Sequence, residues 1–219
     1  AQVKLVAIGD AAQLPEIDAG GLFAAYTRPL PCSQLTGNLR QREPWERAAL
    51  DVLRDGDVLA ALDAYDNAGR LHLHDDAPGA RTAIITDYLT TRAAGGQVVM
   101  LTSRRVDARI LNTLTRHALH QAGGLGRKAL TVTVAGRRTE WRVGDEAVVT
   151  SNHYPLGLIN GSRGRVTQVG NDGVTVATDA GPVEVPRMLL ETGVLTYGYA
   201  LPCHKARGIT VDVALLYAS

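Results

Sequence analysis

The stretch that decides the fold runs from Gln97 to Ala118 and reads QVVMLTSRRVDARILNTLTRHA. Its first six residues are almost continuously apolar, which is typical of a strand that is buried on both faces. Beyond Ser103, which can cap a helix, apolar residues recur every four positions. They are Val106, Ile110, Leu114 and Ala118. A buried strand followed at once by an amphipathic helix predicts an α/β fold with a largely parallel sheet.

Helical patterns also precede this stretch. Trp45, Ala48, Ala49, Val52 and Leu53 follow the spacing of one helix face, and the pattern ends near Gly56. Asp57 can cap a second helix. A third pattern runs from Ile84 to Leu89. The sequence therefore predicts several helices around the strand.

Residues 131–186 follow a different period. Val132 and Val134 alternate with threonines, and further short alternating runs follow up to Val185. Turn signals such as Asn171-Asp172-Gly173 separate the runs. About five short strands in one span predict a small β-barrel. Because the α/β pattern returns near Leu195, the barrel is predicted to be an insertion in the α/β domain.

The bulk composition excludes several classes of protein. The chain has 219 residues, 45% of them hydrophobic and 21% charged, as in soluble globular proteins. Its net charge is +1, so any nucleic-acid contact must come from local patches. Two distant cysteines do not indicate a disulfide framework, and no apolar run is long enough to span a bilayer. We expect a cytoplasmic protein.

Three loops carry candidate residues for phosphate chemistry. Gly9, Asp10 and Gln13 follow a predicted buried strand, where open α/β sheets bind ligands. Arg40 stands alone between predicted elements and has the chemistry to contact a transferring phosphoryl group. The segment from Tyr199 to Gly208 holds His204 and Lys205, which suit phosphate or a nucleic-acid backbone. Taken singly, these features are more often an ordinary turn, a surface arginine and a solvated basic loop.

Basic residues gather between Arg109 and Arg165 with few acidic neighbours. This stretch has the charge for a phosphate-binding groove, although a solvated basic face would have the same composition. The members are Arg109, Arg116, Arg127, Lys128, Arg137, Arg138, Arg142, Arg163 and Arg165. Gly123–Lys128 lacks the spacing of a P-loop, and the sequence contains no such motif. His72 and His74 lack further ligands, so no metal site is predicted.

The order of these motifs resembles the RecD-like helicases of superfamily 1. Residues 9–17 resemble helicase motif III, and Arg40-Gln41 resembles motif IV. Gly144-Asp145, Asn152 and residues 158–164 resemble the barrel inserted in the second motor domain. Residues 199–212 resemble motif V. The run Arg40–Arg47 is most similar to the helicase part of MobF-type conjugative relaxases.

The resemblance implies a RecA-like parallel sheet and a division of the chain. Residues 1–42 would end the first RecA-like domain, and residues 43–130 would begin the second. Residues 131–186 would be an inserted SH3-like β-barrel, and residues 187–219 would return to the second domain. The chain would then be an excised piece, since it also opens and closes on strand patterns at Val3–Ile8 and Val213–Tyr217.

The resemblance also assigns roles to the candidate residues. Gln13 and Arg40 would act on the γ-phosphate as the catalytic pair. The nucleotide would be bound by Gly9, Asp10, Gln13, Arg40, Lys205 and Gly208. Single-stranded DNA would be bound by Asn152, Asn160, His204, Lys205, Arg137 and Arg138. Two residues depart from the family. Pro202 replaces a usual Thr, so a hydroxyl contact to DNA is missing, and Arg207 replaces a usual Gln.

The resemblance implies that the chain is the C-terminal part of an ATP-dependent DNA helicase, which belongs to a conjugative plasmid-transfer relaxase and moves along single-stranded DNA. The expected partner domains are a first motor domain and a nicking domain. ATP and Mg²⁺ would act in the longer protein, and this chain alone would neither hold them tightly nor hydrolyse ATP, because it has no P-loop. Two alternatives stay open. One is a binding module that holds DNA or protein without hydrolysis, and the other is a RecD-like repair helicase.

Overall fold

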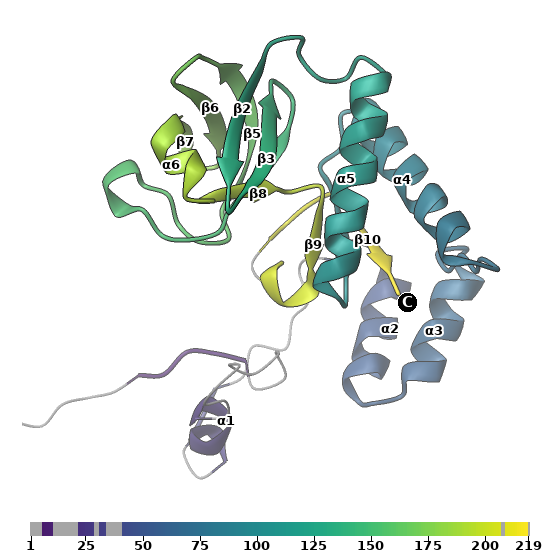
Figure 1. Cartoon of the computed structure of the whole chain (residues 1–219). Coiled ribbons are helices and arrows are strands. Elements are labelled where there is room, and N and C mark those ends of the chain that lie inside the picture. Colours follow the sequence, from purple (N-terminus) through teal and green to yellow (C-terminus); the bar gives the residue numbers. More distant parts are fainter. Residues whose placement is uncertain (1–5, 11–21, 29–30, 34–40, 207–208, 219) are drawn as a thin grey trace, which may run out of the picture. The chain divides into compact units, whose positions relative to one another are not determined.

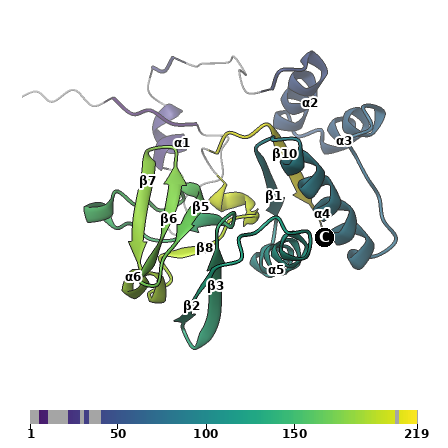
Figure 2. The same ribbon diagram turned by 90° about the horizontal axis from the view of Figure 1, so that it is seen from above.

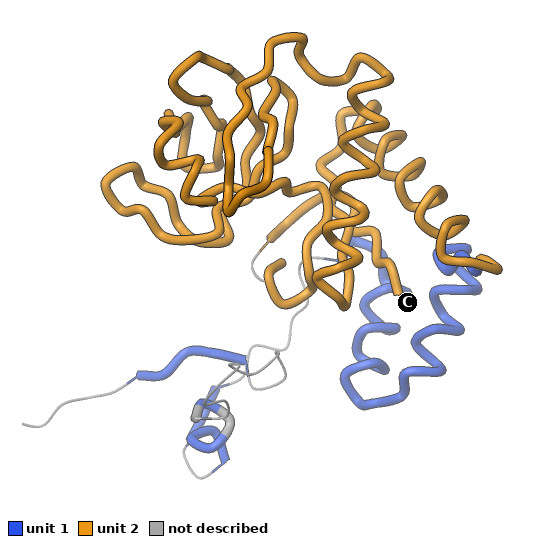
Figure 3. Tube along the Cα trace, in the orientation of Figure 1, with its two compact units in different colours: residues 1–73 blue, residues 74–219 orange. Residues whose placement is uncertain are grey.

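The computed structural model describes residues 6–10, 22–28, 31–33, 41–206 and 209–218. They belong to two compact units, residues 1–73 and residues 74–219, which Figure 3 colours separately. Gln13, Arg40 and Gly208 lie outside the described residues. The structure therefore leaves their predicted roles as predictions.

The described residues of the first unit form three helices, α1 (Leu22–Thr27), α2 (Pro44–Arg54) and α3 (Val58–Asn67). The Trp45 and Tyr65 rings meet edge to face, 5.3 Å apart, and join α2 to α3. Asp57 caps α3, as predicted, because its carboxylate accepts the Ala60 N–H at 3.0 Å. The turn between α2 and α3 requires Gly56, whose φ is +94°.

The predicted strand at Val3–Ile8 is wrong for the residues that the structure describes. Residues 6–10 form no strand, and the side chains of Val6 and Ile8 are 67% and 94% exposed. Within the described part of the chain, no strand pairs with this segment. An apolar run becomes a buried strand only where neighbouring strands satisfy its backbone groups.

The second unit is built on a parallel sheet. Strand β1 (Val98–Thr102) lies between β10 (Val213–Tyr217) and β9 (Ala200–Pro202), and both pairings are parallel. Helices α4 (Ala77–Ala93) and α5 (Arg105–Gln121) share one core with the side chains of Val98 and Met100, so both cover the same face of the sheet (Figures 1 and 2). The predicted parallel α/β arrangement is confirmed.

Helix α5 begins later, and buries a different face, than the sequence predicts. Its N-cap is Arg104 rather than Ser103, and no side chain caps the helix. Val106 and Leu114 are 43% and 42% exposed. The buried positions of α5 are Asp107, Ala108, Leu111, Asn112, Thr115 and Leu119. Two polar members of this face, Asp107 and Asn112, have partners elsewhere in the fold, namely Arg81 and the Ala200 backbone, which local periodicity does not show.

The antiparallel strands lie in sheets separate from the parallel one. Strands β2 (Ala129–Val134) and β3 (Arg137–Arg142) form a hairpin. A five-stranded sheet has the order β7-β6-β5-β4-β8. Its strands are β4 (Glu146–Val149), β5 (Arg163–Val169), β6 (Gly173–Thr178), β7 (Gly181–Pro186) and β8 (Leu195–Tyr197). The antiparallel region thus begins at Ala129 and includes a strand beyond Pro186.

The hairpin and the five-stranded sheet enclose one hydrophobic core. Trp141 of β3 and Val166 of β5 are each 1% exposed and belong to the same cluster, which helix α6 (Arg187–Glu191) extends through Leu190. Only Gly198 and Tyr199 separate β8 from β9. A Cβ at Gly198 would lie 2.9 Å from the Val148 side chain, so the crossing into the parallel sheet needs a glycine.

Candidate nucleic-acid interface

Strand β9 delivers the predicted motif V to the carboxyl edge of the parallel sheet. It ends at Pro202 and continues directly into the 3₁₀ helix η2 (Cys203–Lys205). Lys205 is exposed, and His204 is half-buried with its Nε2 atom unpartnered within the described residues. Ligands of open parallel sheets bind beyond this edge. The structure therefore places His204 and Lys205 at the edge where open parallel sheets bind ligands, and their binding of phosphate stays a prediction.

Asn112 of α5 fixes the strand that leads to this edge. Its Nδ2 donates to the Ala200 carbonyl at 2.9 Å, and its Oδ1 accepts the Ala200 N–H at 3.0 Å. Asn112 is buried, and one edge of β9 pairs with β1. The amide thus satisfies the free side of β9. This residue could not be predicted from the sequence, because an asparagine within a helical pattern does not indicate that its side chain bonds to the backbone of a distant strand.

Asp145 is the centre of a buried polar network between the antiparallel region and α5. Its carboxylate is fully buried and accepts from Arg116 Nε at 2.9 Å, Tyr199 Oη at 2.6 Å and the Arg142 N–H at 2.7 Å. Burial, and then the Asp145 charge, raise the pKa of Tyr199, so its hydroxyl stays protonated and donates. The Gly144-Asp145 motif is therefore a structural junction.

Glu140 of β3 bridges two arginines beside this network. Its Oε1 accepts from Arg116 at 3.1 Å and from Arg142 Nε at 2.7 Å. The hydrogen bond from Arg142, with a further contribution from Arg116, lowers the pKa of Glu140. The Arg116 guanidinium also lies 5.0 Å from the centre of the Tyr197 ring. Burial raises the pKa of Tyr197 to about 12. Arg116 and Arg142 are thus held inside the fold.

Two more members of the predicted basic groove also make internal contacts. Arg165 pairs with Glu146 at 2.8 Å, as does Arg92 of α4 at 2.7 Å. Arg163 donates to the carbonyls of Val98 and Gly198. The exposed members without an ion pair in the described part of the chain are Arg109, Arg127, Lys128, Arg137 and Arg138. Fewer basic residues are therefore available to a ligand than the sequence predicts, since four of the arginines stabilise the fold.

Asn152 and Asn160 meet in the loop that joins β4 to β5. The Asn160 N–H donates to Asn152 Oδ1 at 2.7 Å, and Asn152 Nδ2 donates to Tyr154 Oη at 3.1 Å. Leu158, which is 2% exposed, anchors the loop in the core of the antiparallel region. Tyr154 is 73% exposed. Asn152 therefore organises the loop, and the aromatic ring beside it is the exposed group.

The other predicted nucleotide residues belong to two different units, so their common site stays a prediction. Gly9 and Asp10 are exposed and lie outside regular secondary structure, in the first unit. Lys205 belongs to the second unit. Within the described residues, no cluster of side chains suits a metal ion, and no helix is long and apolar enough to cross a membrane.

Comparison with known proteins shows where these features recur. The conjugal transfer protein TraA of Rhizobium radiobacter is 32% identical over 223 residues, which cover 100% of this chain and 20% of that protein. The ATP-dependent RecD2 DNA helicase of Deinococcus radiodurans is 31% identical and covers 94% of the chain and 27% of its own length. The chain carries a RecD-like helicase region of superfamily 1. A family model described as an AAA domain also matches residues 1–76.

The RecD-like region has the fold of a RecA-like motor domain. A Bacteroides Pif1 helicase crystallised with ADP-AlF3 and single-stranded DNA superposes with a TM-score of 0.55 at 17% identity, over 84% of this chain and 45% of that one. This likeness concerns the fold alone. The chain spans about a fifth of the length of the TraA relatives that it matches.

Proposed function

We propose that this RecD-like region is part of an ATP-driven motor that moves along single-stranded DNA during conjugative plasmid transfer. Similarity to TraA over the whole chain supports the conjugative role. Similarity to a RecD2 DNA helicase, and to Pif1 crystallised with single-stranded DNA, supports the substrate. We expect the protein to act in the cytoplasm, together with a first motor domain and a nicking domain.

One observation carries the proposal furthest. Exposed Lys205 follows β9 at the carboxyl edge of the sheet. The Asn112 side chain fixes β9 through two hydrogen bonds to the backbone of Ala200. A fixed cation at this edge suits the phosphates of DNA or of a nucleotide. We assign His204 and Lys205 to the DNA path, with Arg137, Arg138, Asn152 and Asn160 as further contacts.

The ATP chemistry would require residues beyond this sequence. A P-loop and its Mg²⁺ ligands position the nucleotide in such motors, and the 219 residues contain no P-loop motif. Gln13 and Arg40 would add γ-phosphate contacts to a site that already holds ATP and Mg²⁺. Gly9, Asp10, Lys205 and Gly208 would complete the protein's side of that site. The 219-residue chain alone would not turn over ATP.

We also propose that the antiparallel region is an SH3-like barrel inserted in the second RecA-like domain. The hairpin and the five-stranded sheet share one core, as the walls of a small barrel do. The domain division at residue 42 is part of this proposal, and the barrel has the bounds of the antiparallel region, which begins at Ala129 and includes β8. The junction around Asp145 would hold the barrel against α5.

A binding module without hydrolysis is the second candidate, and a longer sequence that lacks a P-loop motif upstream would favour it. A RecD-like repair helicase is the third, favoured by the similarity to RecD2. A longer sequence with GxxxxGK[ST] upstream would support the motor over the binding module. A nicking domain further upstream would support the relaxase over the repair helicase.

The first test is the affinity of the purified chain for a labelled thymidine oligonucleotide, measured by fluorescence anisotropy. We expect binding without sequence preference that weakens steeply with salt, and Lys205→Gln should weaken it. Arg70→Gln removes an exposed arginine of the first unit and is the matched control. Absence of binding at low salt would contradict the proposed function.

A further inference from the structure

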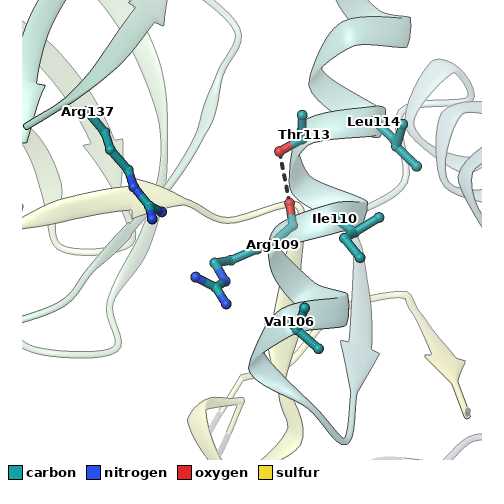
Figure 4. A pocket seen from close by; sticks show the side chains of 6 residues that line it. All are labelled: Val106, Arg109, Ile110, Thr113, Leu114 and Arg137. Carbon is teal, nitrogen blue, oxygen red and sulfur yellow. Dashed lines mark hydrogen bonds between the residues drawn. The ribbon is translucent and has the colours of Figure 1, made fainter.

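A hollow of about 370 Å³ lies between helix α5 and the start of strand β3. Five of its lining residues come from α5, and the sixth is Arg137 at the tip of the β2–β3 hairpin (Figure 4). The α5 members are Val106, Arg109, Ile110, Thr113 and Leu114. The hollow is shallow and open to solvent, so it could hold only part of a ligand.

Two guanidinium groups face this hollow from opposite sides. Arg109 reaches out from α5 and Arg137 from the hairpin, and each points toward the other in Figure 4. Both side chains are exposed, and neither forms an ion pair within the described part of the chain. Two like charges that converge on one space favour an anion between them.

The same two elements show what such an anion does. Two turns further along α5, Arg116 faces Arg142 of β3, and the Glu140 carboxylate bridges them at 3.1 and 2.7 Å. Arg109 and Arg137 also come from α5 and β3. Among the described residues, no carboxylate lies between them. The second pair therefore has the chemistry to bind an anionic group from outside the protein.

The rest of the hollow selects among anions. Val106, Ile110 and Leu114 lie one turn apart on α5, and Val106 and Leu114 are 43% and 42% exposed. In Figure 4 these aliphatic side chains lie on the side of α5 away from Arg137, so the lining has a charged side and an aliphatic side, which suits a ligand that joins a charged group to an apolar one. Arg138 follows Arg137 in β3 and is also exposed, so the hairpin tip carries two positive charges, which favours a polyanion over a single carboxylate.

We propose that this hollow binds one nucleotide unit of single-stranded DNA. A phosphodiester lies between Arg109 and Arg137, and its sugar and base rest against the aliphatic side. A single strand is required, because the base must leave its stack to reach the aliphatic side. This inference rests on the proposed function, since it names a further contact of the same DNA.

The test compares Arg109→Gln, Arg137→Gln and the double variant with the unchanged chain, with Arg70→Gln as the control. The readout is the affinity for a thymidine oligonucleotide across a salt series. Each single variant should lose about threefold to tenfold at about 50 mM salt and flatten the salt slope by about 0.7. Because both arginines hold one phosphate, the double variant should lose little more than either single variant. Val106→Ser with Leu114→Ser should lower the affinity without changing the slope.

The outcomes separate this inference from the proposed function. If the unchanged chain binds DNA and the arginine variants bind equally well, the hollow is not a DNA site although the proposed function stands. If the chain binds no DNA, the proposed function itself fails. A hollow that binds an acidic peptide in preference to the oligonucleotide would be a protein interface, which would also overturn the inference. Losses confined to the hollow variants, with Arg70→Gln unchanged, would support it.

Discussion

At the scale of single residues, the arginines divide into those that hold the fold and those that are free to meet a ligand. Arg116 is shared between Asp145 and Glu140, and Arg92 and Arg165 meet at Glu146. Arg109 and Arg137 have the same chemistry but face open space. The acids that decide this division lie far from the arginines in sequence, since Asp145 is 29 residues from Arg116. The basic stretch can therefore be recognised from the sequence, but the arginines that form ion pairs within the fold cannot.

Replacing Asp145 with asparagine should destabilise the second unit strongly. The substitution removes a fully buried charge and leaves the Arg116 guanidinium, which is 16% exposed, without its main counter-ion. Breaking a buried pair in this way costs about 3–5 kcal/mol. Urea unfolding measures the loss, with Asp87→Asn on the exposed side of α4 as the control. Equal unfolding free energies for the two variants would show that the junction is not stabilising.

Glu140 predicts a dependence of stability on acid pH. Its pKa is lowered from the ordinary 4.5, chiefly by the hydrogen bond from Arg142. A depressed pKa stabilises the fold at pH values above 4.5, and the contribution is lost as the pH falls through the lower folded-state value. Urea unfolding at a series of pH values should therefore show the difference between the unchanged chain and Glu140→Gln shrinking in acid. A constant difference would contradict the assignment.

At the scale of elements, the parallel strand and helix order was predictable, whereas the orientation of α5 was not. The sequence places its aliphatic residues at Val106, Ile110 and Leu114, and period alone assigns that stripe to the core. The structure instead buries Asn112 and Thr115 with Leu111, because Asn112 is satisfied by Ala200, which is 88 residues away. The antiparallel strands were predicted from their period-two pattern, but β8 was missed because it has only three residues.

Asn112→Leu should loosen β9 more than it disturbs α5. Leucine is similar in size but leaves the Ala200 N–H and carbonyl unpaired, at a cost of about 1–3 kcal/mol for each group. Hydrogen exchange at the Ala200 amide should accelerate more than exchange at amides in the middle of α5. Asn67→Leu at the end of α3 is the control, since that position belongs to the first unit. Uniform acceleration across the second unit would instead indicate general destabilisation.

At the scale of the whole molecule, the chain combines a parallel sheet, whose carboxyl edge carries His204 and Lys205, with an antiparallel region that contributes Arg137 and the Asn152 loop. Only two residues connect β8 to β9, and the Asp145 network reaches from the antiparallel region to α5. We infer that these surfaces keep a fixed geometry, as a DNA path within one unit requires. The order of the motifs predicted that a parallel sheet and an antiparallel region occur in one chain. Similarity to a family along the whole chain also predicts which distant segments meet, whereas local residue patterns do not.

The most direct measurement of the DNA path is hydrogen exchange of the purified chain with and without a saturating thymidine oligonucleotide. Our account predicts protection in three places, namely η2, the loop around Asn152 and Asn160, and the first half of α5 with the hairpin tip. Helices α2 and α3 contribute no assigned DNA contact, so their exchange should not change. Protection confined to α2 and α3, or no protection at a DNA concentration that saturates binding, would contradict the central claim that this RecD-like region holds single-stranded DNA at the carboxyl edge of its sheet.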